Sequence, residues 1–549
     1  MSRNDAIKEK SVIKTEITAV TNEGSGVSRY NGAVIFTPFT APGDTAEVRV
    51  EKVGKSCVYG RLERILEPSA DRTEPVCPVF GECGGCALRH IDYAAEVRIK
   101  TGWVAEHIRR IGGFDLEPLP AIPSPKSDRY RNKAIYQAGR DENGKIIFGF
   151  YRRKSHEVIN CESCLLQPEE FAEILKVIKF FAEQTKISVY DEKQHKGLLR
   201  AVYIRKGEVS GETGVCLVIN GRCLPEAELL VSALRARFPQ VVSVMLSINE
   251  ERTNVALGKK FVTLFGKDGI SDELCGVTVD ISPAAFYQVN HGAAELLYRK
   301  AGELAVLTGE ETLLDLYCGA GTIGLSMAAG AKRLIGVEIV PQAVENARRN
   351  AERMGVHNAE FICADAAQAA QTLQKRGLLP DVVVLDPPRK GCDPATLAAV
   401  AAMRPKRIVM VSCDTATMAR DFKALAELGY MPKTAQPVDM FPRTANVETV
   451  VLLSKGEIDS KKVRVDFSLE DMDMSGFQKG ATYDQIKAYV LEHSGMKVSS
   501  LYISQVKRKC GLDVGQNYNL PKMGNAKQPQ CPPEKEKAIR EALKYFGMI

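Results

Sequence analysis

The chain is 549 residues long, 45% hydrophobic and 26% charged, with a net charge of +6, so we expect several domains rather than one core. It has no run of 18 apolar residues and no apolar signal-peptide core, which argues against a membrane protein and against secretion and predicts a cytoplasmic location. Its fifteen cysteines therefore predict metal ligands, catalytic thiols and small core residues rather than disulfides. The small net charge neither requires nor excludes a nucleic-acid partner.

Residues 1–68 predict a small β-barrel. Short apolar stretches, expected as strands at 11–20, 33–36, 46–53 and 57–65, are separated by turn sequences. The glycine-rich segment 22–26 is expected to be one of these turns. Small closed barrels are common platforms for single-stranded RNA, but a generic β-domain has the same strand spacing.

Residues 69–280 predict a central α/β domain that begins with a cysteine cluster. Cys77, Cys83 and Cys86 lie within ten residues, and a fourth thiol can come from Cys161 or Cys164. Four thiolates can hold zinc or an iron–sulfur cluster, and the spacing alone does not decide between them.

Residues 281–455 alternate between helix and strand patterns, which predicts a doubly wound parallel sheet of the Rossmann type. An apolar strand at 312–317 leads into Gly319-x-Gly321-x-x-Gly324 and then a helix, and this turn lets a ligand approach the backbone closely. Glu338 ends the next strand, where a carboxylate can bind ribose hydroxyls. Dehydrogenases and methyltransferases share this geometry.

Chemistry-bearing residues follow two later strands of the same predicted sheet. Asp386-Pro387-Pro388, which is typical of methyltransferases that act on bases, follows one strand, and Cys413 follows another. Both therefore lie at the carboxyl edge, beside the cofactor turn. Cys413 is a candidate nucleophile and Glu448 a candidate general base. Asp439 and Asp421 are weaker alternatives for the base.

Residues 456–549 predict a linker and a helical extension. The segment 466–474 is acidic, and helices are expected at 483–493, 499–509 and 533–545. Lys507-Arg508-Lys509 on the second helix suits an RNA- or partner-binding module, although a packing appendage fits equally well.

Together these segments resemble the RNA uracil-5-methyltransferase family, which contains 23S ribosomal RNA enzymes and the tRNA thymidine-forming enzyme. The resemblance covers nearly all of residues 10–455. The motifs that carry it are Phe286 to Asn290, Asp315 to Gly324, Gly336 to Glu338, Asp386 to Gly391, Ser412 to Asp414 and Val447 to Thr449.

The resemblance implies methyl transfer from S-adenosylmethionine (SAM) to carbon 5 of a uracil in structured RNA. It implies Cys413 as the nucleophile that adds to carbon 6, Glu448 as the base, and Phe286 near a flipped base. Many relatives have Asn-Pro after the catalytic cysteine, whereas this chain has Asp414-Thr415. The implied cofactor-site residues are Gln288, Tyr317, Glu338 and Asp386.

The resemblance also implies that the N-terminal barrel is similar to the TRAM domain, an RNA-binding module. It favours a 4Fe–4S cluster on Cys77, Cys83, Cys86 and Cys164, with Cys161 incidental. The cluster motif favours 23S ribosomal RNA over tRNA as substrate, and we expect a monomer. Competing interpretations are a methyltransferase of exocyclic amines, in which an aromatic residue normally follows Asp-Pro-Pro, and a non-catalytic RNA-binding protein.

Overall fold

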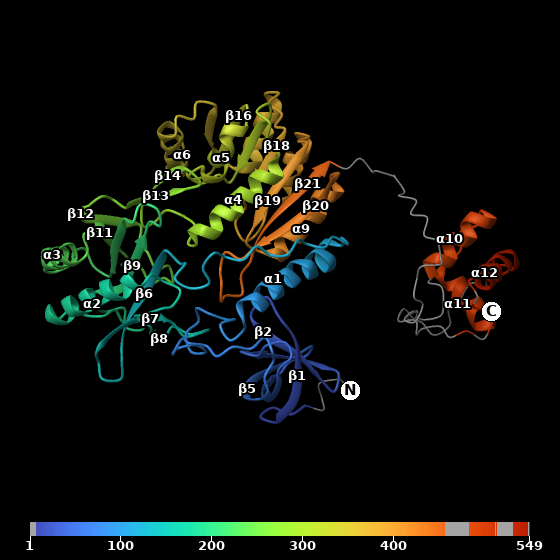
Figure 1. Ribbon diagram of the computed structural model, residues 1–549, viewed down its shortest axis with the longest axis horizontal. Coiled ribbons are helices and arrows are strands. Elements are labelled where there is room, and N and C mark those ends of the chain that lie inside the picture. The colour runs from blue at the N-terminus through green and yellow to red at the C-terminus, as the bar shows by residue number, and fades with distance from the viewer. Residues whose placement is uncertain (1–6, 456–482, 511, 513–530, 547, 549) are drawn as a thin grey trace. The chain divides into compact units, whose positions relative to one another are not determined.

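The computed structural model describes residues 7–455, 483–510, 512, 531–546 and 548 (Figure 1). The chain divides into two compact units, residues 1–458 and 459–549, and each is described by itself. The acidic linker predicted at 466–474 lies outside the described residues. No helix in the described ranges is both long and apolar enough to cross a membrane.

The predicted N-terminal barrel is confirmed as a closed five-stranded barrel with the strand order β1-β2-β3-β5-β4. The segment expected as a turn at 22–26 differs in part, because Ser25 and Gly26 already belong to β2 and pair with β3. Gly26 is required there, since a Cβ would lie 1.9 Å from Oγ1 of Thr40. The strands are β1 (Val12–Val20), β2 (Ser25–Tyr30), β3 (Ala33–Pro38), β4 (Thr45–Val53) and β5 (Val58–Glu67).

A helix and a mixed sheet follow the barrel. Helix α1 (Tyr93–His107) continues into a π-helical turn at Ile108–Gly112. The sheet has the strand order β12-β11-β10-β9-β6-β7-β8, and α2 (Glu169–Gln184) and α3 (Ala227–Arg237) share its apolar core. Its strands are β6 (Lys133–Arg140), β7 (Ile146–Tyr151), β8 (Val158–Asn160), β9 (Leu199–Lys206), β10 (Thr213–Ile219), β11 (Val241–Ile248) and β12 (Lys260–Gly266). The hairpin β13 (Ile270–Leu274) and β14 (Val277–Ile281) leads to the next domain.

The predicted Rossmann-like sheet is present, with the order β17-β16-β15-β18-β19-β21-β20. Its first five strands are parallel. The predicted parallel sheet is confirmed for these five strands, and β20 runs in the same direction; among the described strands of this sheet β21 alone is reversed, antiparallel to both β19 and β20. The strands are β15 (Thr312–Leu316), β16 (Arg333–Glu338), β17 (Ala359–Cys363), β18 (Val382–Leu385), β19 (Arg407–Ser412), β20 (Tyr430–Val438) and β21 (Glu448–Lys455).

Helices cover both faces of this sheet. On one face α4, α5 and α6 contribute to the core, and on the other face α1, α7, α8 and α9 do so. The alternation within β15, where Leu313 faces the first core and Leu314 the second, shows that both faces are buried. The helices are α4 (His291–Ala305), α5 (Thr322–Met327), α6 (Pro341–Arg353), α7 (Ala366–Lys375), α8 (Pro394–Ala402) and α9 (Thr415–Glu427).

The C-terminal unit is helical, as predicted. It consists of α10 (Tyr483–Ser494), α11 (Ser500–Lys509) and α12 (Pro533–Tyr545). The three helices share a small apolar core of their own that includes Ile486, Ile503 and Ile539.

Candidate active site

The glycine-rich turn after β15 contains residues with left-handed backbone, and one of its glycines has no room for a side chain. Tyr317 and Gly321 both have positive φ, of 65° and 80°. A Cβ on Gly324 would lie 2.7 Å from Oδ2 of Asp315 and 2.9 Å from Leu334. Its absence lets α5 start close to the sheet, with the Gly324 N–H donating to Oδ2 of Asp315 at 2.9 Å. The predicted strand–turn–helix is therefore confirmed, with the close backbone approach at Gly324 that such turns have.

Glu338, at the end of β16, closes one side of this turn. Its carboxylate accepts hydrogen bonds from the N–H groups of Gly319, at 3.1 Å, and Val340, at 2.9 Å. These contacts hold the carboxylate against the glycine turn, where a ribose could reach it.

Tyr298, on α4, links three parts of the site. Its hydroxyl lies 3.5 Å from Oγ1 of Thr322 at the start of α5 and lies near the Gln288 side chain and the Asp386 carboxyl, both of which affect its pKa. Burial raises the pKa of Tyr298, so its phenol stays neutral. The sequence carried no signal for Tyr298, because α4 is an ordinary amphipathic helix.

The Tyr317 side chain takes another direction. Its phenol contacts Thr396 and Cys392, beyond the Asp-Pro-Pro segment, and it packs against the α7–α9 face of the sheet. The backbone of Tyr317, rather than its side chain, forms part of the glycine turn. Phe286, predicted to lie near a flipped base, has a side chain that is 80% exposed.

A buried carboxyl group, Asp315, and a partly buried one, Asp386, lie beside the turn. Burial raises the pKa of Asp386, after β18, to about 7. Burial also raises the pKa of Asp315, on β15, to about 8, and the nearby Asp386 and Glu338 add to this shift. Oδ1 of Asp315 has no hydrogen-bond partner among the described atoms. The electrostatics at this edge therefore favour a positively charged ligand.

Cys413 and Glu448 meet because β19 and β21 are antiparallel. Ser412 pairs with Thr449. Cys413 follows Ser412 and Glu448 precedes Thr449, so the antiparallel register brings the thiol beside the carboxyl group. Burial, together with the nearby Asp386 and against the opposing effect of Arg389, raises the pKa of Glu448 to about 8. Burial and the Glu448 charge raise the pKa of the Cys413 thiol to about 11, and Arg389 again opposes the shift.

This arrangement joins a half-buried thiol to a carboxyl group that can exchange a proton near neutral pH. Arg389 is the only cation described that lowers the pKa of both groups. The sequence carried no signal for this role of Arg389, which directly follows Asp-Pro-Pro. The alternative bases have cation partners: Asp439 contacts Lys100 and Asp421 contacts Arg420.

The cysteines of the central domain are brought near one another. Burial raises the pKa of Cys83, and the charges of Cys164 and Cys77 raise it further. Burial raises the pKa of Cys86 to about 12, with Cys164 and Cys83 also contributing. The Cys83 Sγ accepts a hydrogen bond from the Gly85 N–H at 3.4 Å.

Cys161, expected to be incidental, lies beside Cys164. The interaction between the two thiols raises the pKa of Cys161 and lowers the pKa of Cys164. The Cys164 Sγ also accepts a hydrogen bond from the Leu166 N–H at 3.5 Å. Within the ranges that the structure describes, no three His, Cys, Asp or Glu side chains are arranged as a metal site. The thiols are thus neighbours without a ready-made coordination geometry.

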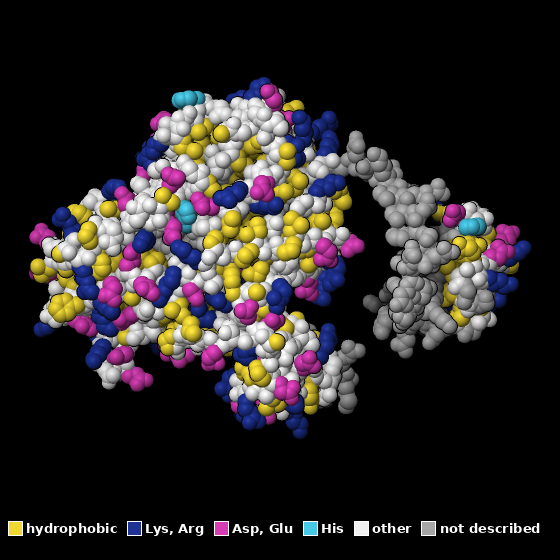
Figure 2. Space-filling model, in the orientation of Figure 1, with side chains coloured by type: hydrophobic (Ala, Val, Ile, Leu, Met, Phe, Trp, Pro, Cys, Tyr) yellow, Lys and Arg dark blue, Asp and Glu magenta, His cyan; other side chains and the backbone are white. Residues whose placement is uncertain are grey.

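The surface offers no single basic face in the view of Figure 2, where Lys and Arg side chains are interspersed with Asp and Glu. This agrees with the small net charge of the chain.

Comparisons with known proteins identify the family to which the chain is similar. Residues 117–456 match the family described as tRNA (Uracil-5-)-methyltransferase, and residues 8–62 match the TRAM domain. An uncharacterized RNA methyltransferase of Clostridium tetani is 40% identical over 454 residues, which are 83% of this chain and 98% of that protein. Another, from Halalkalibacterium halodurans, is 41% identical over 455 residues, which are 82% and 99% of the two chains.

A solved structure extends the comparison to the fold. The crystal structure of Pyrococcus abyssi tRNA (uracil-54, C5)-methyltransferase in complex with S-adenosyl-L-homocysteine is 30% identical, with a TM-score of 0.65. The similarity covers 80% of this chain and 99% of that chain. The family match ends at residue 456, before α10.

Proposed function

Since the chain belongs to the tRNA (uracil-5-)-methyltransferase family and is a SAM-dependent RNA methyltransferase, we propose that it makes 5-methyluridine in 23S ribosomal RNA, with Cys413 as a covalent nucleophile. The observation that carries this proposal is the side-by-side arrangement of Cys413 and Glu448 next to the glycine turn. The reaction takes place in the cytoplasm.

The first half of the reaction makes carbon 5 nucleophilic. Carbon 5 of uracil is too weak a nucleophile to take a methyl group from a sulfonium unaided. The Cys413 thiolate adds to carbon 6, which forms a C–S bond and an enolate, and carbon 5 then takes the methyl group from SAM. The thiol pKa of about 11 means that its proton must leave during the attack.

The second half restores the ring. Carbon 5 now carries both a proton and the new methyl group. Glu448 removes the proton, the double bond re-forms and the C–S bond breaks, which frees Cys413. A carboxyl pKa of about 8 supports this role, because it makes the Glu448 carboxylate a stronger base than an ordinary one.

Four residues are proposed to hold SAM, whose sulfonium supplies the methyl group. Glu338 would bind the ribose hydroxyls and Tyr317 would shape the glycine turn through its backbone. Gln288 and Asp386 would line the pocket near the methyl group, since both contact or adjoin Tyr298. The neutral Tyr298 hydroxyl would orient these two side chains.

The domains are proposed to share the work. Residues 1–68 would bind RNA outside the target nucleotide, and residues 281–455 would contain the active site. Residues 69–280 would brace both, and 456–549 would form an appended linker and helical unit. Phe286, being exposed, is available to stack on an extruded base.

A 4Fe–4S cluster on Cys77, Cys83, Cys86 and Cys164 remains part of the proposal. Its support is the mutual proximity of these thiols and the backbone N–H donors aimed at two of the sulfurs. The cysteines would have to shift to coordinate iron. The cluster would brace the domain rather than carry electrons, because methyl transfer needs no redox step.

Iron and acid-labile sulfide in protein purified without oxygen test the cluster. We expect both to be stoichiometric in the parent chain and in Cys216→Ser, a buried cysteine elsewhere, and to be lost in Cys83→Ser. Finding zinc instead, or no metal in the parent, would contradict the assignment.

A covalent trap tests the nucleophile. RNA that contains 5-fluorouridine should form an adduct that survives denaturing gels, because fluorine cannot leave carbon 5 as a proton does. Cys363→Ala, which removes an exposed cysteine at the end of β17, should still form the adduct, and Cys413→Ala should not. Methylation of an exocyclic amine without any adduct would point to the other enzyme class.

A second substrate, tRNA, is favoured by the similarity to the Pyrococcus abyssi tRNA enzyme. Mapping of 5-methyluridine on purified 23S ribosomal RNA and on tRNA, each lacking the modification and each incubated with the protein and SAM, separates the two. We expect the ribosomal RNA to be methylated and the tRNA to stay unmodified.

A further inference from the structure

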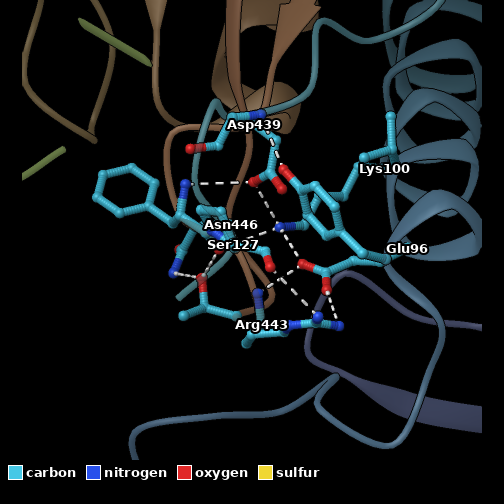
Figure 3. A network of polar contacts seen from close by, with 12 residues as sticks. Glu96, Lys100, Ser127, Asp439, Arg443 and Asn446 are labelled. Atoms are coloured by element: carbon cyan, nitrogen blue, oxygen red, sulfur yellow. Dashed lines mark hydrogen bonds and ion pairs between the residues drawn. The ribbon is translucent and has the colours of Figure 1, made fainter. Parts of the chain in front are cut away.

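The turn between β20 and β21, residues 439–447, leads directly into Glu448 and is called the base turn here. A buried network from α1 holds it (Figure 3). The Lys100 ammonium donates to Oδ1 of Asp439 and to Oε1 of Glu96, each at 2.7 Å. The backbone N–H of Arg443 donates to the same Glu96 oxygen at 2.7 Å. The Arg443 guanidinium lies 3.7 Å from the other Glu96 oxygen. Two carboxylates and two cations therefore balance one another at the interface between α1 and the turn.

Arg443 also ties the turn to the cysteine-bearing segment. Its carbonyl accepts hydrogen bonds from the N–H groups of Ala87, at 2.9 Å, and Leu88, at 3.1 Å, which follow Cys86. Its guanidinium donates to the Ile91 carbonyl at 3.1 Å. Its φ of 68° lies in the left-handed region that non-glycine residues rarely adopt. The surrounding contacts therefore hold Arg443 in a conformation that it would not choose alone.

Other contacts tie the base turn to the cofactor side of the site. The Asn290 side chain donates to the Met440 carbonyl at 3.0 Å, and Asn290 lies two residues after Gln288. The Tyr130 hydroxyl donates to the Pro442 carbonyl at 3.0 Å. The turn is thus fixed by segments from three separate parts of the sequence.

Glu448 stands where the base turn enters β21, at the last pair of the hairpin. It pairs with Val438 of β20, the residue just before the base turn, but the ladder between β19 and β21 ends at the pair Ser412–Thr449, so no pairing with β19 holds Glu448 on the Cys413 side. Its neighbour Val447 is buried but comes from the turn. A shift of about 1 Å at the base can lower a rate by about 100-fold.

We propose that Arg443 is a positioning residue that holds Glu448 beside Cys413 through the base turn. Its loss slows proton removal from carbon 5 while methyl transfer continues. This inference rests on the proposed function, because it assigns the two halves of the reaction to Cys413 and Glu448.

Single-turnover reactions of the full chain with substrate RNA separate the two halves. Methyl incorporation reports the first half, and release of tritium from carbon 5 of labelled uridine reports the second. Arg443→Ala should incorporate methyl within about 3-fold of the parent rate but release tritium about 10- to 100-fold more slowly. The covalent adduct between the protein and RNA without 5-fluorouridine should accumulate as tritium release slows.

Arg407→Ala is the matched control. Arg407 is a partly buried arginine at the other end of β19 that donates to the Ala305 and Val306 carbonyls and pairs with Glu311. It should change both halves equally or not at all. Unchanged binding of SAM by calorimetry would show that the Arg443→Ala pocket is intact.

Equal slowing of both halves in Arg443→Ala would overturn the inference. So would a ratio of methyl-incorporation rate to tritium-release rate equal to that of Arg407→Ala. Where Arg443→Ala does not fold, Arg443→Lys and Arg407→Lys are compared by the same ratio, and equal ratios would also overturn it. Failure of the parent to form any adduct with 5-fluorouridine RNA would instead refute the proposed function.

Discussion

Buried carboxyl groups occur in two regions of the larger unit, and their partners differ. At the base turn, Glu96 and Asp439 are fully buried and both contact Lys100. At the carboxyl edge of the catalytic sheet, Glu448 is buried and Asp386 is partly buried, yet neither has an ion pair or a hydrogen bond to a cation among the described residues. Paired charges stabilise an interface, whereas unpaired acids with raised pKa values are typical of a site that binds or transforms a ligand.

The largest effect that we expect tests the catalytic side of this comparison. Cys413→Ala should lower RNA methylation by about 10⁴-fold or more, because a covalent step cannot proceed without its nucleophile. Transfer of labelled methyl from SAM to RNA measures this. Cys363→Ala should keep the parent rate. Methylation by Cys413→Ala at that same rate would exclude the covalent route.

The next effect concerns the unpaired Glu448. Glu448→Gln should slow release of methylated RNA by about 10²- to 10⁴-fold, the range for loss of a general base. The adduct with ordinary RNA should accumulate, and denaturing gels measure it. Glu345→Gln, at an exposed position on α6, is the control. Rapid turnover of Glu448→Gln would show that another group removes the proton.

Removing a cation from the paired region should cost stability rather than catalysis alone. Lys100→Met leaves Glu96 and Asp439 buried without their partner, which should lower the free energy of unfolding by about 3–5 kcal/mol. Asp386→Asn removes a partly buried acid that lacks a cation partner, so it should be neutral or stabilising without SAM. Urea denaturation compares the two variants. Similar losses in both would break the distinction between the two regions.

The pH dependence of stability gives a smaller effect per pH unit. The pKa of Glu448 is raised from an ordinary 4.5 to about 8, so the folded state holds a proton that the unfolded state loses in this window. The stability that this proton contributes is complete below pH 4.5 and is lost as the pH rises to about 8, by up to about 1.4 kcal/mol per unit. The parent should therefore lose stability relative to Glu448→Gln across this range in thermal unfolding without SAM. A pH-independent difference would contradict the raised pKa.

The smallest expected effect is a proton count. The sulfonium of SAM is positive, so its binding should favour ionised Asp386 and Glu448 and release protons near pH 7. Calorimetry in buffers of different ionisation enthalpy measures this release. S-adenosylhomocysteine lacks the positive charge and should release fewer protons. Equal release by both ligands would show that the buried acids do not respond to the sulfonium.

The sequence by itself determined the elements whose signals are local. Apolar periodicity and glycine turns predicted the barrel, the strands that end near Glu338, Asp386 and Cys413, and the three C-terminal helices. The residues that specify a turn or the start of a helix lie within a few positions of one another, so these elements can be predicted without knowledge of the rest of the chain. The short β2 escaped prediction because its glycine-rich start reads as a turn until its partner strand is known.

Only the tertiary structure decided which distant residues meet. The antiparallel direction of β21 brings Glu448 to Cys413, and strand direction depends on pairing between segments far apart in the sequence. Tyr298, Arg389 and the network of Lys100 with Arg443 likewise acquire their roles through contacts across the fold. Sequence patterns record which face of an element is buried, but the burial that raises the pKa of Glu448 arises only when several elements close around one carboxyl group.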